Sequence, residues 1–407
     1  MCYTLSMDKV EELLTRGVEK IYPSKEELEK VLRSGKKLKI YQGFDPTGIQ
    51  LHIGHMVGLR KLKQWQDLGH HVIFLIGDGT GQAGDPSGKK HAREKFLTRE
   101  ELRKNAVDYI KQAGKIVRFE GENPVEILFN GDWLNELKLV DILNIAGRFS
   151  LQQLLERDLF QQRIKQDEDV NLREFLYPLL QAYDSVVMEV DLELGGSDQT
   201  FNMLAGRTLI KKMKNKDKFV MTTPLLTDSR GVKIGKTEGN VIALTDKPED
   251  LFGKIMAFPD DVIIKGFEYL TNVTAEEIKR IEKELPKGEN PVDFKKKLAF
   301  EIVKELSNTQ DAEKAQKSFE QTVQGKELPD DVPVFQYDAN GDQDIVSLLM
   351  QTKLAASKSD AKRLIKQGGV SIDEIIIKNL DEPVAPKSGM ILRVGKRKFV
   401  KIKTSAR

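Results

Sequence analysis

The fold of this chain is decided by residues 39–76, which read KIYQGFDPTGIQLHIGHMVGLRKLKQWQDLGHHVIFLI. Residues 39–43 read as a short strand, residues 54–68 have the apolar spacing of a helix, and residues 72–76 form an apolar run typical of a strand buried on both faces. A strand, a helix and a strand in this order predict a parallel βαβ unit. We therefore expect an α/β protein with a Rossmann-like parallel sheet, whose ligands bind at the carboxyl ends of the strands.

The rest of the chain divides by pattern into further segments. We expect helices over residues 8–34 and further strands near residues 116–119 and 224–227. The pattern from about residue 248 to 325 is helical and charged, and the stretch that follows is rich in Pro, Asp and Gly, as linkers are. The predicted domains are residues 1–235 (Rossmann-like), 236–328 (α-helical) and 344–407 (small α/β), with a linker at 329–343.

Composition bounds the class of protein. The 407 residues are 39% hydrophobic and 31% charged, which is enough for real cores and a polar surface. The longest apolar run is far shorter than the roughly 20 residues that span a bilayer, and the N-terminal residues lack a secretory apolar segment. A single cysteine, Cys2, excludes an internal disulfide and a cysteine-rich zinc cluster. We expect a cytoplasmic protein without a membrane partner.

The last part of the chain is basic. Residues 344–407 carry fourteen Lys or Arg against six Asp or Glu, a net charge of +8, so the remainder carries −6. A basic segment on a mildly acidic body suggests a polyanionic partner. A solvated, lysine-rich surface explains the charge equally well.

The loop at residues 43–55 is the most informative stretch for function. It follows a strand and opens a helix, where backbone N–H groups and the helix dipole attract phosphate. Gly54 removes a side chain where a flat base could approach. His52 and His55, three residues apart, reach one side of the first helical turn and could donate to phosphate oxygens. A surface coincidence or a metal site is the alternative, although no Glu accompanies the two histidines.

Two signatures resemble the class I aminoacyl-tRNA synthetases. Residues 52–55 read HIGH, the first motif of that family, and residues 233–237 read KIGKT, which is similar to its KMSKS loop. Two lysines around a glycine on a mobile loop suit a pyrophosphate that is gripped and then released. Without the upstream motif, the second segment would read as an exposed basic loop.

The resemblance implies a reaction and its site. An amino-acid carboxylate attacks the α-phosphorus of ATP, pyrophosphate leaves, and no general base is needed because the carboxylate is already ionised. The resemblance assigns the catalytic charges to Thr47, His52, His55, Lys89, Arg93, Lys233 and Lys236. It assigns ATP binding to Asp45, Gly54, Gly196, Asp198 and Lys236. Magnesium is expected with the ATP, and no dedicated protein-held metal.

Three further segments resemble the tyrosine-specific members. Tyr177, Gln181 and Asp184 have the spacing of one helical face, where a polar substrate or a self-satisfied core network would supply their partners. By resemblance, Tyr41 and Asp184 hydrogen-bond the substrate phenol, and Asp85, Tyr177 and Gln181 hold its ammonium group. The full predicted tyrosine-binding set is Tyr41, Asp85, Asn130, Tyr177, Gln181, Asp184 and Gln199.

The basic tail resembles the small S-four-type RNA-binding domain found at the end of bacterial tyrosine enzymes. Its predicted RNA-binding residues are Lys358, Lys362, Arg363, Lys366, Lys396 and Arg397. The resemblance implies tyrosine activation with ATP, transfer to tRNA(Tyr), and a homodimer. A tryptophan enzyme of the same fold and an RNA-binding paralogue without catalysis are the alternatives.

Overall fold

The computed structural model describes residues 8–48, 50–87, 96–156, 158–235, 241–287, 290–321, 332–337, 343–373, 375–377, 379–380, 383–395 and 398–404. The chain forms two compact units, Met1–Ala312 and Glu313–Arg407. None of the helices in these ranges has the length and apolar character that a bilayer crossing requires.

The first unit is built on a six-stranded sheet with the order β1-β6-β5-β2-β3-β4. Its strands are β1 (Lys20–Tyr22), β2 (Lys39–Phe44), β3 (His71–Ile76), β4 (Glu126–Phe129), β5 (Leu192–Gly196) and β6 (Phe219–Thr223). All neighbours are parallel except β1, which pairs antiparallel with β6 at the edge. The predicted α/β class and parallel sheet are confirmed.

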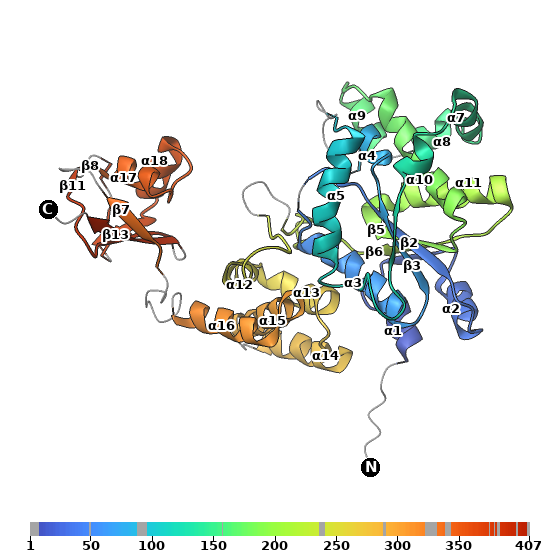
Figure 1. Ribbon diagram of the computed structural model, residues 1–407. Helices are drawn as coiled ribbons and strands as arrows, with labels where there is room; N and C mark the ends of the chain where they lie inside the picture. The colour runs from blue at the N-terminus through green and yellow to red at the C-terminus, as the bar shows by residue number, and fades with distance from the viewer. Residues whose placement is uncertain are drawn as a thin grey trace, which may run out of the picture. The chain divides into compact units, whose positions relative to one another are not determined.

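Helices cover both faces of this sheet (Figure 1). They are α1 (Lys9–Thr15), α2 (Lys25–Arg33), α3 (Ile53–Asp67), α4 (Thr80–Ala83), α5 (Arg99–Ala113), α6 (Gly131–Leu134), α7 (Leu139–Ala146), α8 (Leu151–Leu155), α9 (Asp158–Lys165), α10 (Leu172–Met188) and α11 (Thr200–Lys214). The helix α3 packs on β2 and β3, and α11 packs on β5 and β6. The chain moves across the sheet in opposite directions from β2 and from β5, so right-handed crossovers place α3 and α11 on opposite faces.

A helical segment follows β6 within the same unit. It contains α12 (Pro248–Met256), α13 (Ile263–Leu270), α14 (Ala275–Glu284) and α15 (Pro291–Leu306), with short 3₁₀ turns at Asp260–Val262 and Leu285–Lys287, and α16 (Thr309–Phe319) follows. The helix α13 packs against α3 of the sheet region. The helical segment therefore contacts the same helix that carries the HIGH sequence.

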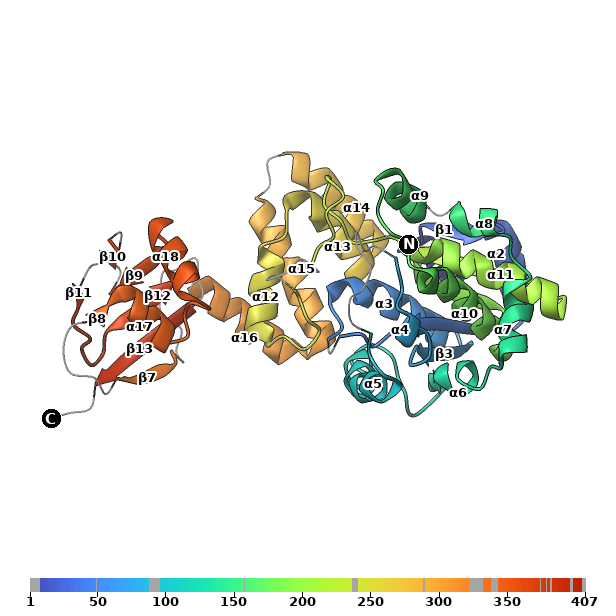
Figure 2. The same cartoon turned by 90° about the horizontal axis from the view of Figure 1, so that it is seen from above.

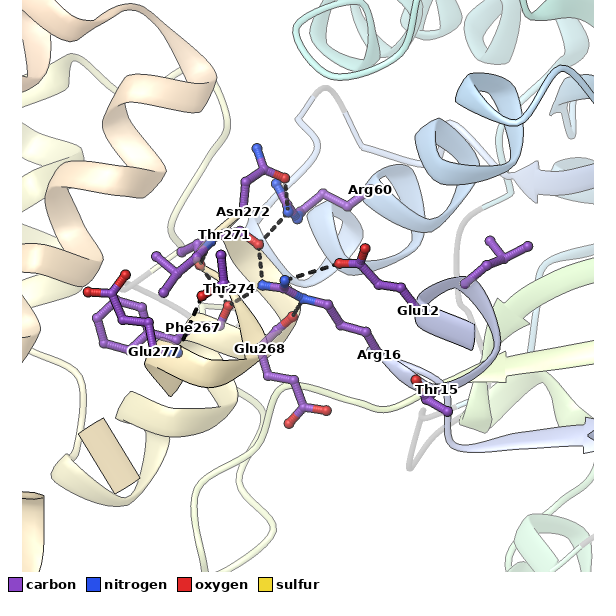
Figure 3. Close-up of polar contacts among 12 residues, drawn as sticks. Glu12, Thr15, Arg16, Arg60, Phe267, Glu268, Thr271, Asn272, Thr274 and Glu277 are labelled. Carbon is purple, nitrogen blue, oxygen red and sulfur yellow. Dashed lines mark hydrogen bonds and ion pairs between the residues drawn. The ribbon is translucent and has the colours of Figure 1, made fainter. Parts of the chain in front are cut away.

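Two arginines hold this contact together (Figure 3). Arg16, just after α1, donates to the backbone oxygens of Phe267, Glu268 and Thr271 at 3.1, 3.0 and 2.6 Å. Arg60, on α3, donates to the Thr271 oxygen at 2.5 Å and forms an ion pair with Glu305 of α15. These cations lie at the C-terminal end of α13, where unpaired carbonyls and the helix dipole favour positive charge.

Lys61 lies beside Arg60 but points to α1. Its Nζ donates to the oxygens of Leu13 and Arg16 at 2.9 and 2.6 Å. Burial lowers the pKa of Lys61 to about 7. A neutral amine keeps two N–H groups, which is enough for both carbonyls.

The second unit has its own five-stranded sheet, in the order β10-β9-β12-β13-β7. Its elements are β7 (Val334–Tyr337), β8 (Gln343–Asp344), α17 (Ile345–Gln351), α18 (Lys358–Lys366), β9 (Val370–Ile372), β10 (Ile375–Ile376), β11 (Pro383–Val384), β12 (Ile391–Val394) and β13 (Lys398–Thr404). Figure 2 shows α17 and α18 beside this sheet. Side chains of the helices and strands share one core, which includes Leu348, Ile365, Leu392 and Ile402. The strand β7 pairs with β13, so part of the segment expected to be a linker is sheet.

Three local expectations were wrong. Residues 116–119 do not form a strand, because Ile116 and Val117 are buried in the turn that ends α5, and the strand begins at Glu126. The strand expected at 224–227 lies earlier, because β6 ends before Pro224, which lacks the N–H that a ladder needs. The helical expectation for residues 8–34 omitted β1, which lies between α1 and α2.

Candidate active site

A cavity of about 460 Å³ opens at the carboxyl ends of the parallel strands. The strand order reverses between β2 and β5, and ligands of open α/β sheets bind at such a switch point. Fifteen of the residues expected to be functional line this one cavity: Tyr41, Asp45, Thr47, His52, Gly54, His55, Asp85, Asn130, Tyr177, Gln181, Asp184, Gly196, Asp198, Gln199 and Lys233. The sheet therefore brings together residues up to 192 positions apart in the chain.

The two histidines of the HIGH sequence cap the helix α3. His52 is the N-cap residue, and its Nδ1 accepts from the Gly54 N–H at 3.1 Å. The Nδ1 of His55 accepts from the backbone N–H of His52 at 3.1 Å. A neutral imidazole that accepts at Nδ1 carries its proton on Nε2. Both rings are thereby held in the tautomer whose Nε2–H can donate to an anion.

Gly54 has a local reason to be glycine. A Cβ added there would lie 3.0 Å from Cε1 and 3.1 Å from Nδ1 of His52. The missing side chain gives room to the His52 ring in its capping position. The start of α3 is also tied to the segment after the KIGKT sequence, because the Ile53 N–H donates to the Ile242 oxygen at 2.9 Å.

A buried carboxylate and a buried phenol lie at one end of the cavity. Asp184 accepts from Asn130 Nδ2 at 3.0 Å and from Trp133 Nε1 at 2.8 Å. Burial raises the pKa of Asp184 well above its usual value, and these two donors offset part of that rise. Burial and the charge of Glu193 raise the pKa of Tyr41, so its hydroxyl is neutral at pH 7. The Tyr41 hydroxyl lies 3.1 Å from Ser185 Oγ.

The other polar residues of α10 also have protein partners. Tyr177 donates to Asp45 Oδ2 at 2.8 Å, and Gln181 Nε2 donates to Glu193 Oε1 at 2.9 Å. The Oε1 atom of Gln181 is buried and has no hydrogen-bond partner in the described part of the chain. Most polar groups on this helical face thus have protein partners, and one acceptor remains for a ligand.

Two cavity residues expected to have separate roles form an ion pair. Lys233 Nζ lies 2.9 Å from Asp198 Oδ2, and both side chains are about one third exposed. Asp85, in turn, accepts from Gln199 Nε2 at 2.7 Å. The sequence did not indicate either pairing, because the partners are 35 and 114 residues apart.

Sequence reasoning missed a second layer of polar residues. Glu193 on β5, Lys218 just before β6 and Ser185 on α10 are buried together behind Tyr41. Glu193 lies between Leu192 and Leu194, and this alternation is typical of a solvent-facing charge. The buried Thr80 hydroxyl, which bonds Asp45 and Asn130, gave no signal at all.

Five expected residues lie outside the described part of the chain: Lys89, Arg93, Lys236, Lys396 and Arg397. The other four expected RNA-binding residues are exposed on α18: Lys358, Lys362, Arg363 and Lys366. Within the described ranges, no group of three or more His, Cys, Asp or Glu side chains is arranged to hold a metal ion.

Comparison with known proteins identifies the family. Residues 33–324 match the family described as tRNA synthetases class I (W and Y), and residues 324–402 match the tyrosine–tRNA ligase SYY-like C-terminal domain. The tyrosine–tRNA ligase of Thermotoga maritima is 42% identical over 96% of both chains. That of Methylococcus capsulatus is 41% identical over 98% of this chain and 99% of its own.

A solved structure agrees with these relatives. The C-terminally truncated mitochondrial tyrosyl-tRNA synthetase of Aspergillus nidulans superposes with a TM-score of 0.66 and 26% identity, covering 77% of this chain and 94% of that one. The chain belongs to the class I tRNA synthetases of the W and Y group. Its match to the tyrosine members extends over nearly its full length. Within that group, its function is that of a tyrosine–tRNA ligase, which implies the use of ATP.

Proposed function

We propose that the cavity at the sheet's switch point activates tyrosine with ATP and then transfers it to tRNA(Tyr). The observation that carries this proposal is the meeting of fifteen expected site residues in one cavity. In this proposal Tyr41 and Asp184 read the phenol, while Tyr177, Gln181 and Asp85 hold the ammonium group. Asn130 holds Asp184 in place, and Gln199 does the same for Asp85.

The reaction requires the protein to position the substrates and to stabilise negative charge. The carboxylate of tyrosine attacks the α-phosphorus, and negative charge moves onto the departing pyrophosphate. Thr47, His52, His55 and Lys233 would stabilise that charge, together with Lys89, Arg93 and Lys236. The tautomer of His52 and His55 supports this role, because each presents an N–H donor rather than a lone pair.

The nucleotide would occupy the cavity between α3 and the end of β5. Asp198 and the Gly196 backbone would bind the ribose, with Asp45 and Gly54 nearby. Asp198 pairs with Lys233, so the group proposed to bind the ribose and a cation proposed to bind the phosphates lie side by side. Mg²⁺ would arrive on the phosphates, which supply the oxygen ligands that it prefers.

The remaining proposals concern domains, tRNA and assembly. We keep residues 1–235 and 236–328 as the catalytic and helical domains of a cytoplasmic enzyme, and we extend the RNA-binding domain of residues 344–407 to include β7, which pairs with β13. The exposed cations Lys358, Lys362, Arg363 and Lys366 on α18 would contact tRNA phosphates.

A homodimer is supported by exposed apolar side chains on α7 and at the start of α10. Leu139, Val140 and Leu143 of α7 and Leu172 of α10 are 73, 58, 61 and 75% exposed. Large apolar side chains exposed in such numbers mark association sites, and a second copy of the chain would cover them. Sedimentation of Leu143→Glu tests this proposal, with a monomer expected where the native chain is a dimer. A dimeric variant would contradict it.

Two substitutions test the tyrosine-binding end and the phosphate-binding end of the site separately. We expect Gln181→Ala to raise the KM for tyrosine in ATP–pyrophosphate exchange without changing the KM for ATP, because Gln181 belongs to the ammonium end and its hydrogen-bond partner is Glu193. We expect Thr47→Ala to lower kcat with little change in either KM, since its proposed contact forms as charge develops. An equal effect of both variants on both substrates would contradict the proposed division.

A further inference from the structure

A buried ion pair lies directly behind the phenol end of the cavity. Lys218 and Glu193 are each about 1% exposed and form an ion pair with each other. Lys218 Nζ also donates to Ser185 Oγ at 2.8 Å, and Ser185 Oγ lies 3.1 Å from the Tyr41 hydroxyl. A continuous chain of hydrogen bonds therefore runs from an ammonium group to the hydroxyl that we propose reads the substrate.

The direction of this chain follows from its donors. An ammonium group can only donate, so Ser185 Oγ accepts from Lys218. The Ser185 proton must then go elsewhere, either to Glu193 Oε2 at 3.5 Å or to Tyr41 at 3.1 Å. O–H···O bonds are normally 2.5–3.0 Å long, so the contact with Tyr41 is the better one. Tyr41 accepts from Ser185, so its own proton is donated either to Glu193, which adds to burial in raising the pKa of Tyr41 through its charge and hydrogen bond, or to a ligand.

The hydrogen bonds expected at the ligand run in the same direction, from Tyr41 toward Asp184. Both oxygens of Asp184 already accept N–H bonds, at 2.8 and 3.0 Å, and these bonds oppose the rise in pKa that burial causes, so they stabilise the carboxylate form that would accept from one more donor. A phenol placed between Tyr41 and Asp184 would accept from Tyr41 and donate to Asp184. A phenylalanine ring can do neither.

The residues around the ion pair of Lys218 and Glu193 are arranged to accommodate it. Burial lowers the pKa of Lys218, and the charge of Glu193 and its hydrogen bond oppose that change. A Cβ added at Gly206 would lie 2.5 Å from Lys218 Nζ, so glycine at this position makes room for the ammonium group. Glu193 also accepts from Gln181, so the same pair orients the amide proposed to bind the ammonium end of the substrate.

We propose that Lys218, Glu193 and Ser185 are positioning residues for substrate selection, which fix the Tyr41 hydroxyl as a donor to the phenol of tyrosine. This inference rests on the proposed roles of Tyr41 and Asp184. In this inference Lys218 supplies a group that can only donate a hydrogen bond. Glu193 stabilises the positive charge of Lys218 although the side chain is buried.

The test compares pyrophosphate exchange in the presence of tyrosine with exchange in the presence of phenylalanine that has been purified of contaminating tyrosine. Ser185→Ala removes one oxygen and leaves the ion pair intact. We expect it to lower the ratio of kcat/KM for tyrosine over phenylalanine by about two- to tenfold, the range for one neutral hydrogen bond, with the KM for ATP unchanged. Thr222→Val is the matched control, because it removes a buried hydroxyl that bonds only the Lys20 oxygen in the described structure. It should leave the ratio unchanged.

A double-mutant cycle separates this inference from the proposed function. Tyr41→Phe should lower the ratio, and Ser185→Ala should then add nothing in that background, because the two groups act through one contact. Lys218→Met combined with Glu193→Gln removes both charges together, which avoids leaving one buried charge alone, and should lower the ratio as Ser185→Ala does.

Each outcome decides a separate point. If Tyr41→Phe lowers the ratio while Ser185→Ala and the double variant do not, the positioning role is wrong and the phenol assignment stands. Additive effects of Tyr41→Phe and Ser185→Ala also overturn the positioning role. If Tyr41→Phe itself leaves the ratio unchanged, the assignment of Tyr41 fails, and the positioning role fails with it.

Discussion

Replacing Asp184 with asparagine tests the phenol end of the site with almost no change in volume. The carboxylate accepts from Trp133 at 2.8 Å and from Asn130 at 3.0 Å, and the substrate hydroxyl would be a third donor. An asparagine offers one acceptor oxygen and an NH₂ group that faces a donor. The loss of a hydrogen bond to a charged acceptor costs about 1.5–3 kcal/mol. This corresponds to about a 10- to 150-fold lower kcat/KM for tyrosine.

The assay is pyrophosphate exchange with tyrosine and with phenylalanine at varied ATP. Phenylalanine has no hydroxyl to lose, so the ratio of the two kcat/KM values should fall by the same factor, with the KM for ATP unchanged. Asp78→Asn is the matched control, because Asp78 is also a buried carboxylate, bonded to Arg99, Arg103 and the Gly131 N–H. It should lower stability and spare the ratio. Equal losses for tyrosine and phenylalanine in Asp184→Asn would mean that Asp184 does not bind the substrate hydroxyl.

Three further predictions follow from other parts of the structure. Lys233→Ala should lower kcat of exchange by about 100-fold while the KM for tyrosine stays constant, and a changed tyrosine KM would count against a role on the phosphates. Reversing the charge of Lys362 and Lys366 together should leave pyrophosphate exchange unchanged and raise the KM for tRNA. The slope of the logarithm of tRNA affinity against the logarithm of salt concentration should fall in magnitude by about two. An unchanged slope would mean that α18 does not contact tRNA. The folded-state pKa of Lys61 is lowered to about 7 from 10.5, so the unfolded chain holds the extra proton between these values. The unfolding free energy of the native chain, relative to Lys61→Met, should therefore rise with pH from about 7 to 10.5 by up to about 1.4 kcal/mol per pH unit in urea melts; a flat difference would contradict the burial argument.

The hydrophobic pattern of the sequence predicted the fold correctly where the pattern was pronounced. Residues 39–76 gave β2, α3 and β3 because a continuous apolar run and a helical spacing leave little choice. The strand β1 escaped notice because it has three residues and gains its order from pairing with β6, some 200 positions away. Residues 116–119 misled because an apolar turn at the end of a helix has the same composition as a short buried strand.

The site shows the same limit. His52, Tyr41 and Asp184 could be named from motifs, since their positions are fixed by short segments around them. Lys218 and Glu193 could not, because only the packing of β5 and β6 brings these two charges together, 25 residues apart. Pairing between distant segments is decided by tertiary structure, which no local spacing records.

A crystal structure of this chain with L-tyrosine would show directly whether Tyr41 and Asp184 read the phenol. We expect the phenol oxygen within about 2.5–3.2 Å of both the Tyr41 hydroxyl and an Asp184 oxygen, with the ammonium group beside Tyr177 and Gln181. A tyrosine bound with its ring oxygen away from Tyr41 and Asp184 would contradict this assignment.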